Sequence, residues 1–264
     1  MSGRRGRTRQ RVRRGVYLVP SLFTTANAFC GFFSLVETMR QNYTTAATLI
    51  IVAMVADVLD GRIARLTGTT SAFGAAFDSL ADLVSFGVAP AMLALSWGLW
   101  LRPRLGPAVA FLYLIGGATR LARFNTRAHD PRFFEGLPIP GAAGAVALAV
   151  LNAPAPVRDP RPALAACALV AGLAVLMVST LPYPTFRQID LRRRWPVTAI
   201  FGIATVFALL VFGRARILAG LLVVYLLSAP YLVLARRSRR APQPAPREEG
   251  TSADGPDTTP DLPA

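Results

Sequence analysis

Four aspartates within 26 residues are the part of this sequence best suited to chemistry. Asp57 and Asp60 are three residues apart, and Asp78 and Asp82 are four apart, so each pair shares one face if its segment is a helix. Both segments are otherwise strongly apolar, as membrane spans are. Because an ionisable side chain at membrane depth is costly, these four carboxylates predict a functional site.

A short link centred near residue 69 joins the two segments, so we expect them to run antiparallel. Asp60 and Asp78 are each 9 residues from this point, whereas Asp57 and Asp82 are 12 and 13 residues from it. This spacing predicts that Asp60 faces Asp78 and that Asp57 faces Asp82. Carboxylates so close together need positive charge, and oxygen ligands favour hard cations, so we expect one or two divalent ions, Mg²⁺ or Mn²⁺.

The residues beside the aspartates favour a phosphate-containing ligand. Gly61 and Gly74 lack side chains and would let a bulky ligand approach the helix backbones. Arg65 follows Gly61 by four residues, and its planar guanidinium can bind a phosphate.

Two other interpretations of the same acids stay open from the residues alone. The aspartates could pair with arginines and merely hold helices together, although only Arg62 and Arg65 are near them in sequence. They could also line the ion path of an ion-coupled transporter.

The composition predicts an all-α integral membrane protein, a polytopic helical bundle. Hydrophobic residues make up 53% and charged residues 16% of the chain, and the mean hydropathy is +0.43. The apolar residues form blocks long enough to cross a bilayer as helices. We predict eight transmembrane helices, at residues 18–39, 44–65, 73–99, 106–124, 137–153, 163–180, 195–212 and 216–234.

The arginines predict how these helices are oriented. All 29 basic residues are arginines, and with eight spans 22 of them fall on the side that holds both termini and seven on the other. This asymmetry predicts that both termini are cytoplasmic and that the aspartates lie near the cytoplasmic face of the cell membrane. The net charge of +15 is spread over short links, which favours anionic lipid headgroups over nucleic acid as the partner.

The chain divides into one membrane domain and two polar ends. Residues 1–15 carry seven arginines and are expected to form a disordered arm, and residues 236–264 are expected to be a disordered tail. Residues 16–235 form the membrane domain. Cys30, Cys167 and His129 lie far apart in sequence, which does not favour a disulfide or a metal site among them.

The aspartate segment resembles the signature of the CDP-alcohol phosphatidyltransferases, D-x2-D-G-x2-A-R-x8-G-x3-D-x3-D, without a gap. The resemblance implies a membrane enzyme that uses a divalent metal to displace CMP from a CDP-linked lipid with an alcohol. It implies that the first three aspartates bind metal and that the last completes the metal site and acts as general base. The matching positions are Asp57, Asp60, Gly61, Ala64, Arg65, Gly74, Asp78 and Asp82.

The same resemblance suggests roles for the smaller residues of the signature. Gly61, Ala64 and Gly74 would leave room for the cytidine moiety, and Arg65 would hold a phosphate of the CDP-lipid.

Segments outside the signature resemble the bacterial, membrane-embedded phosphatidylserine synthases of this family. They are TTANAFCGFFS in the first span, LADLVSFGVAPA at 80–91, TRLARFN at 119–125, GLPIPGAAG at 136–144 and YPTF at 183–186. This resemblance implies CDP-diacylglycerol and L-serine as substrates, and homodimers are common in the family. Ser21 departs from the pattern, since many relatives have asparagine there.

Serine as acceptor would require a cation for its carboxylate. Arg120 and Arg123, three residues apart, are the candidates, with Asn125 as a hydrogen-bond partner. Both arginines could instead bind lipid phosphate or serve as topology signals. Glycerol 3-phosphate or inositol phosphate stays open as an alternative acceptor.

Overall fold

The chain is helical almost throughout. The computed structural model describes residues 4–67, 72–126 and 134–183, together with 216, 217, 219, 220 and 223. Within these residues four segments are long and apolar enough to cross a membrane, namely Tyr43–Gly61, Ala72–Trp97, Leu105–Thr126 and Pro160–Val178. This agrees with the prediction of a helical membrane protein. Apart from those five single residues, the predicted seventh and eighth spans lie outside the described part, as does the tail at 236–264.

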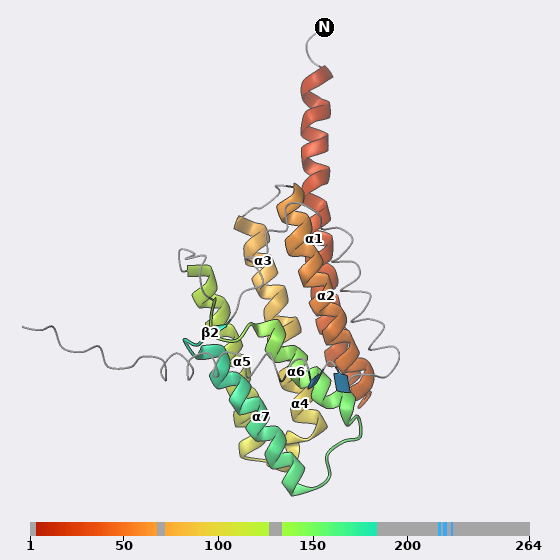
Figure 1. Cartoon of the computed structure of the whole chain (residues 1–264). Coiled ribbons are helices and arrows are strands. Elements are labelled where there is room, and N and C mark those ends of the chain that lie inside the picture. Colours follow the sequence, from red (N-terminus) through yellow and green to blue (C-terminus); the bar gives the residue numbers. More distant parts are fainter. Residues whose placement is uncertain are drawn as a thin grey trace, which may run out of the picture.

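The first helix, α1 (Arg4–Met39), begins well before the predicted start at residue 18. Most of the basic arm expected to be disordered therefore continues this helix, and Figure 1 shows its first turns projecting beyond the other helices. The physical reason is that arginine is a good helix former and that extending an existing helix avoids the cost of nucleation.

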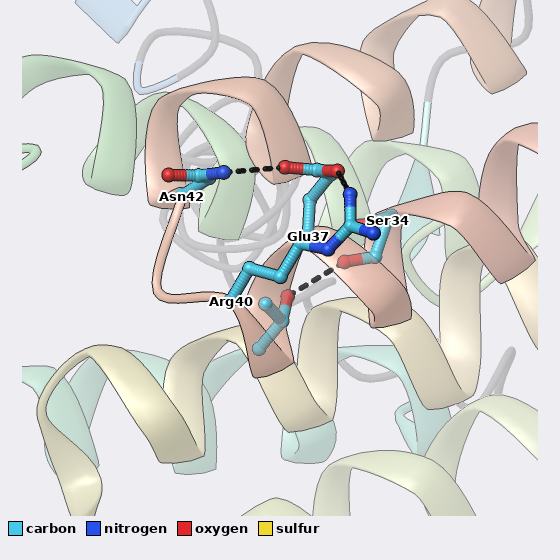
Figure 2. Close-up of polar contacts among 5 residues, drawn as sticks. Ser34, Glu37, Arg40 and Asn42 are labelled. Carbon is cyan, nitrogen blue, oxygen red and sulfur yellow. Dashed lines mark hydrogen bonds and ion pairs between the residues drawn. The ribbon is translucent and has the colours of Figure 1, made fainter.

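A tight turn joins α1 to α2 (Tyr43–Thr67). Gln41 adopts a φ of +62°, and the amides of Gln41 and Asn42 donate to the carbonyls of Thr38 and Glu37 at 3.0 and 2.9 Å, as in a Schellman motif. The Glu37 carboxylate accepts hydrogen bonds from Arg40 at 3.0 Å and Asn42 at 2.7 Å (Figure 2). These contacts fix α1 and α2 as an antiparallel pair, side by side in Figure 1.

The third predicted span is one continuous helical segment with a change of helix type inside it. It comprises α3 (Ala72–Asp82), the π-helical η1 (Leu83–Val88) and α4 (Ala89–Trp97). The Tyr113 hydroxyl donates to the Phe86 carbonyl of η1 at 3.1 Å. π-helical turns are rare in proteins, and those that occur are often at functional sites. The π-helical turn that begins directly after Asp82 therefore favours a functional role for that residue.

The remaining helices enclose the central segments. A single 3₁₀ turn, η2 (Leu99–Leu101), leads to α5 (Leu105–Thr126), and α6 (Ile139–Asn152) and α7 (Pro160–Val178) follow. The predicted fifth span, 137–153, is the 14-residue α6, which at 1.5 Å per residue covers about 21 Å. α6 is mostly buried and packs against α2, α4 and α7, and it is shorter than the four segments that are long enough to cross a membrane.

A pair of two-residue strands is the one β element within the described residues. β1 (Phe134–Glu135) pairs antiparallel with β2 (Pro182–Tyr183), which the all-helical prediction did not include. The chain then turns at Gly136, whose φ is +80° and whose amide donates to the Leu181 carbonyl at 3.0 Å. This pairing brings together residues that are 47 and 49 positions apart in sequence.

Gly31 lets α1 approach η1 closely. A Cβ atom there would lie 2.3 Å from Ser85 Oγ and 2.7 Å from Ser85 Cα, so the backbones would have to separate. We expect Gly31→Ala to lower the free energy of unfolding by about 1–3 kcal/mol and to lower the thermal midpoint of the detergent-solubilised protein. The matched control is Gly172→Ala in α7, because a Cβ at Gly172 meets nothing within 4 Å. Equal midpoints for the two variants would contradict the close approach.

Candidate active site

Three of the four predicted aspartates converge between α2 and α3. Asp57 from α2 and Asp78 and Asp82 from α3 each offer a carboxylate oxygen, and these oxygens lie within 4.8 Å of one another. None of the three side chains is exposed. The spacing along the two helices thus brings together residues that are 21 to 25 positions apart in sequence.

Asp60 lies outside this group of three and has a partner on α1. Its side chain is 6% exposed, and one carboxylate oxygen accepts a hydrogen bond from the Thr24 hydroxyl. Its other oxygen, Oδ1, is buried with no hydrogen-bond partner among the described residues. α1 therefore holds Asp60 through Oδ2, while Oδ1 can still accept a hydrogen bond or bind a cation.

Asn27, one turn after Thr24 on α1, contacts the other end of the site. Its Nδ2 donates to Asp82 Oδ1 at 2.9 Å, and the Asn27 side chain is fully buried. Neither Thr24 nor Asn27 was predicted from the sequence to be a site residue. The signal that could have found them is the 3, 4, 3, 4 spacing of small and polar residues in an apolar span, at Thr24, Asn27, Gly31, Ser34 and Thr38.

The residues present fit a hard divalent cation. The cluster consists of carboxylate oxygens, the ligand type that Mg²⁺ and Mn²⁺ prefer. Next to it the buried Oδ1 atoms of Asp60 and Asn27 have no hydrogen-bond partner among the described residues, although buried oxygens are nearly always paired. A bound cation and its water ligands would satisfy such atoms and offset the repulsion between the carboxylates.

The glycines and Arg65 are placed only in part. Gly61 directly follows Asp60 on α2, and Gly74 lies one turn before Asp78 on α3, so both flank the acids as predicted. Ala64 and Arg65 belong to α2, but their side chains lie outside the described residues. Their contacts with a CDP-lipid therefore remain predictions.

The three residues predicted to bind serine have different surroundings. Arg120 is 9% exposed and lies within electrostatic range of Asp82. Arg123 Nη1 donates to the Val178 carbonyl at the end of α7 at 2.9 Å, a favourable place for a cation. Asn125 exchanges hydrogen bonds with the Ser79 hydroxyl at 2.9 and 3.3 Å. Arg120 is thus buried and interacts electrostatically with Asp82, and Arg123 contacts the end of α7.

A family comparison identifies the chain. The model of the CDP-alcohol phosphatidyltransferase family matches residues 17–180, more than half of the sequence, and this range contains all four aspartates. This chain belongs to the CDP-alcohol phosphatidyltransferase family. The resemblance inferred from the signature is confirmed, and the family favours a transferase over an ion-coupled transporter.

Several relatives of this chain are named as enzymes that form serine-containing lipids. A CDP-diacylglycerol–serine O-phosphatidyltransferase of Helicobacter pylori is 39% identical over 217 residues, covering 80% of this chain and 90% of the relative. The Bacillus subtilis protein of the same name is 36% identical over 170 residues, covering 64% and 92%. An archaetidylserine synthase of Methanothermobacter thermautotrophicus is 34% identical over 168 residues, covering 63% and 69%. Each name contains serine, in agreement with the predicted subfamily.

Proposed function

We propose that this chain is a phosphatidylserine synthase, which transfers the phosphatidyl group of CDP-diacylglycerol to the hydroxyl of L-serine. The observation that carries the proposal is the cluster of Asp57, Asp78 and Asp82 in a chain whose relatives bear that enzyme name. In the reaction the serine oxygen bonds to the phosphorus that bears diacylglycerol, and the bond from that phosphorus to CMP breaks. The products are phosphatidylserine and CMP.

The aspartates would divide the work of this reaction. Asp57, Asp60 and Asp78 would hold one or two ions of Mg²⁺ or Mn²⁺, and Asp82 would complete that site. When bound, the metal supplies neutralisation of the pyrophosphate charge and of the leaving CMP. Asp82 would take the proton of the serine hydroxyl as general base, and the supporting observation is that its carboxylate lies with those of Asp57 and Asp78 at the end of α3.

The lipid substrate would lie against the helices that carry the signature. Gly61, Ala64 and Gly74 would leave space for the cytidine moiety, and Arg65 would bind a phosphate. The supporting observation is that Gly61 and Gly74 adjoin the carboxylates on α2 and α3.

Arg120 is the residue we propose for the serine carboxylate, because it is buried and interacts electrostatically with Asp82, whereas Arg123 bonds to the end of α7. We expect Arg120→Gln to raise the KM for serine about 10- to 100-fold, the effect of losing one charged hydrogen bond. The KM for CDP-diacylglycerol should change little. Arg123→Gln removes the same charge three residues away and should affect the KM for serine much less. A raised KM for CDP-diacylglycerol with an unchanged one for serine would assign Arg120 to lipid phosphate instead.

The test of the reaction is CMP release by the purified enzyme from CDP-diacylglycerol against a panel of alcohols. We expect turnover with L-serine and little with glycerol 3-phosphate or inositol phosphate. Preferred use of glycerol 3-phosphate or inositol phosphate would support phosphatidyl transfer but contradict L-serine as the acceptor. Solute flux in vesicles without any CMP release would reject the transferase altogether.

We also propose that the chain has eight transmembrane helices, with both termini and the aspartate site on the cytoplasmic side of the cell membrane. The asymmetric distribution of arginines supports this orientation. Cysteine labelling of single-cysteine variants in intact cells, at positions near each terminus, would test it. Labelling of one terminus from outside the cell would contradict an even number of spans.

A further inference from the structure

A buried polar face of α1 runs along the helices that carry the aspartates. Thr24, Asn27, Ser34 and Thr38 are each 4% exposed or less, although the outer face of the same helix presents exposed phenylalanines at Phe29 and Phe32. The polar face is spaced for one side of a helix, and α1 packs against α2, α3 and η1. The side chains of this polar face therefore point toward α2, α3 and η1.

Thr24 and Asn27, the first two residues of the polar face, each bond to an aspartate, and the two aspartates lie on different helices. Thr24 donates to Asp60 of α2, and Asn27 donates to Asp82 at the end of α3. Thr24 and Asn27 are three residues apart, about 4.5 Å along the helix. One turn of α1 thus spans from the α2 side of the site to the α3 side.

This turn of α1 is itself anchored to the segment that follows Asp82. The Ser85 hydroxyl of η1 donates to the Asn27 carbonyl at 2.8 Å, and Ser85 is fully buried. Gly31 allows the contact by keeping its side of α1 free of a Cβ atom, which would overlap Ser85. Asn27 is consequently tied to α3 and η1 by both its side chain and its backbone.

The hydrogen bonds also select atoms on each carboxylate. Asn27 occupies Oδ1 of Asp82 and Thr24 occupies Oδ2 of Asp60. Each of these bonds fixes the rotation of its carboxylate and thereby the direction of the other oxygen. Side chains that orient metal-binding carboxylates in this way tune affinity although they do not touch the metal.

We propose that Thr24 and Asn27 are positioning residues, which hold Asp60 and Asp82 in the arrangement that binds the divalent cation. The proposal rests on the proposed function, because it takes these aspartates as metal ligands. It predicts that the apo site is preformed by α1 and that loss of either hydrogen bond weakens metal binding before any substrate is added.

The test measures Mn²⁺ binding to the purified full chain in detergent, without substrate, from the electron paramagnetic resonance signal of free Mn²⁺. We expect Thr24→Val and Asn27→Leu each to weaken Mn²⁺ affinity about 10- to 100-fold. Thr24→Ser retains the hydroxyl and should restore affinity close to that of the wild type. If Asn27→Leu does not fold, Asn27→Ser, which is too short to reach Asp82, replaces it.

The matched control is Thr38→Val. Thr38 lies on the same face of α1 and is 3% exposed, but its hydroxyl donates to the Ser34 carbonyl within the helix at 2.8 Å. Its affinity for Mn²⁺ should match that of the wild type. Unchanged Mn²⁺ affinity in both Thr24→Val and Asn27→Leu would overturn the proposal, as would a loss of affinity in Thr38→Val of the same size. Such a result would not contradict the proposed reaction. That reaction is contradicted instead when the wild type releases no CMP.

Discussion

Asp82→Asn is expected to reduce CMP release about 10²- to 10⁴-fold, the usual contribution of a general base. Asparagine keeps the shape of the side chain but neither accepts the serine proton nor carries the charge that binds a cation. Asp78→Asn should lower CMP release to a similar extent, because the cluster then holds two carboxylates instead of three. The measurement is the rate of CMP formation from CDP-diacylglycerol and L-serine at saturating metal.

The stability of these variants should move in the opposite direction to their activity. Without metal the carboxylates of Asp57, Asp78 and Asp82 repel one another at separations of 4.8 Å or less, so removing one charge relieves repulsion in the apo protein. We expect the thermal midpoint of either variant without metal to equal or exceed that of the wild type. Acids with a purely structural role would show the reverse, a lower midpoint and near-normal turnover.

A matched control for both variants is Asp159→Asn. Asp159 is exposed and precedes α7, and asparagine serves as well as aspartate at the start of a helix. The same chemical change should there leave CMP release and the thermal midpoint unchanged.

Removal of divalent metal is the second large effect that we expect. The described carboxylates require a cation to stay together in the ionised form, and the metal is expected to supply several kcal/mol of charge stabilisation to the reaction. Excess EDTA should therefore lower CMP release about 100-fold or more, since each 1.4 kcal/mol is a factor of ten. Addition of Mg²⁺ or Mn²⁺ beyond the chelator should restore it.

The wild type and Asp78→Asn together make the chelation experiment decisive. The wild type should lose and regain its activity, and its thermal midpoint should rise on metal addition, because a ligand bound only by the folded state stabilises it. Asp78→Asn should show a smaller rise at the same metal concentration. Full activity of the wild type in EDTA would contradict a metal-dependent reaction.

Much of the site could be predicted because the information is local. A helix places residues three and four positions apart on one face, so the paired spacing of Asp57 with Asp60 and of Asp78 with Asp82 already implied two acidic faces. The short link between the two helices implied an antiparallel hairpin. Depth within the hairpin follows from counting residues, and the approach of Asp57 to Asp82 agrees with this count, whereas the place of Asp78 beside both does not follow from it.

Contacts between elements distant in sequence could not be predicted in the same way. The counting placed Asp60 opposite Asp78; in the structure Asp60 interacts electrostatically with Asp78, but one of its oxygens bonds to Thr24, 36 residues earlier, which the count could not show. The rotation of α2 about its own axis decides which oxygens turn toward the cluster, and this rotation depends on packing against α1. Likewise, the sequence offers no reason to prefer Arg120 or Arg123 as the ligand of the serine carboxylate. The structure distinguishes them, because Arg123 bonds to the end of α7.

The sequence by itself determined the family of this protein, since four aspartates and their spacing carry its signature, and carboxylate ligands favour a hard divalent cation. The tertiary structure decided how those acids are held. Thr24 and Asn27 reach the aspartates because α1 packs across α2 and α3, with Gly31 against Ser85. The physical reason is that helix periodicity is a property of neighbouring residues, whereas hydrogen bonds between helices depend on close packing of whole segments.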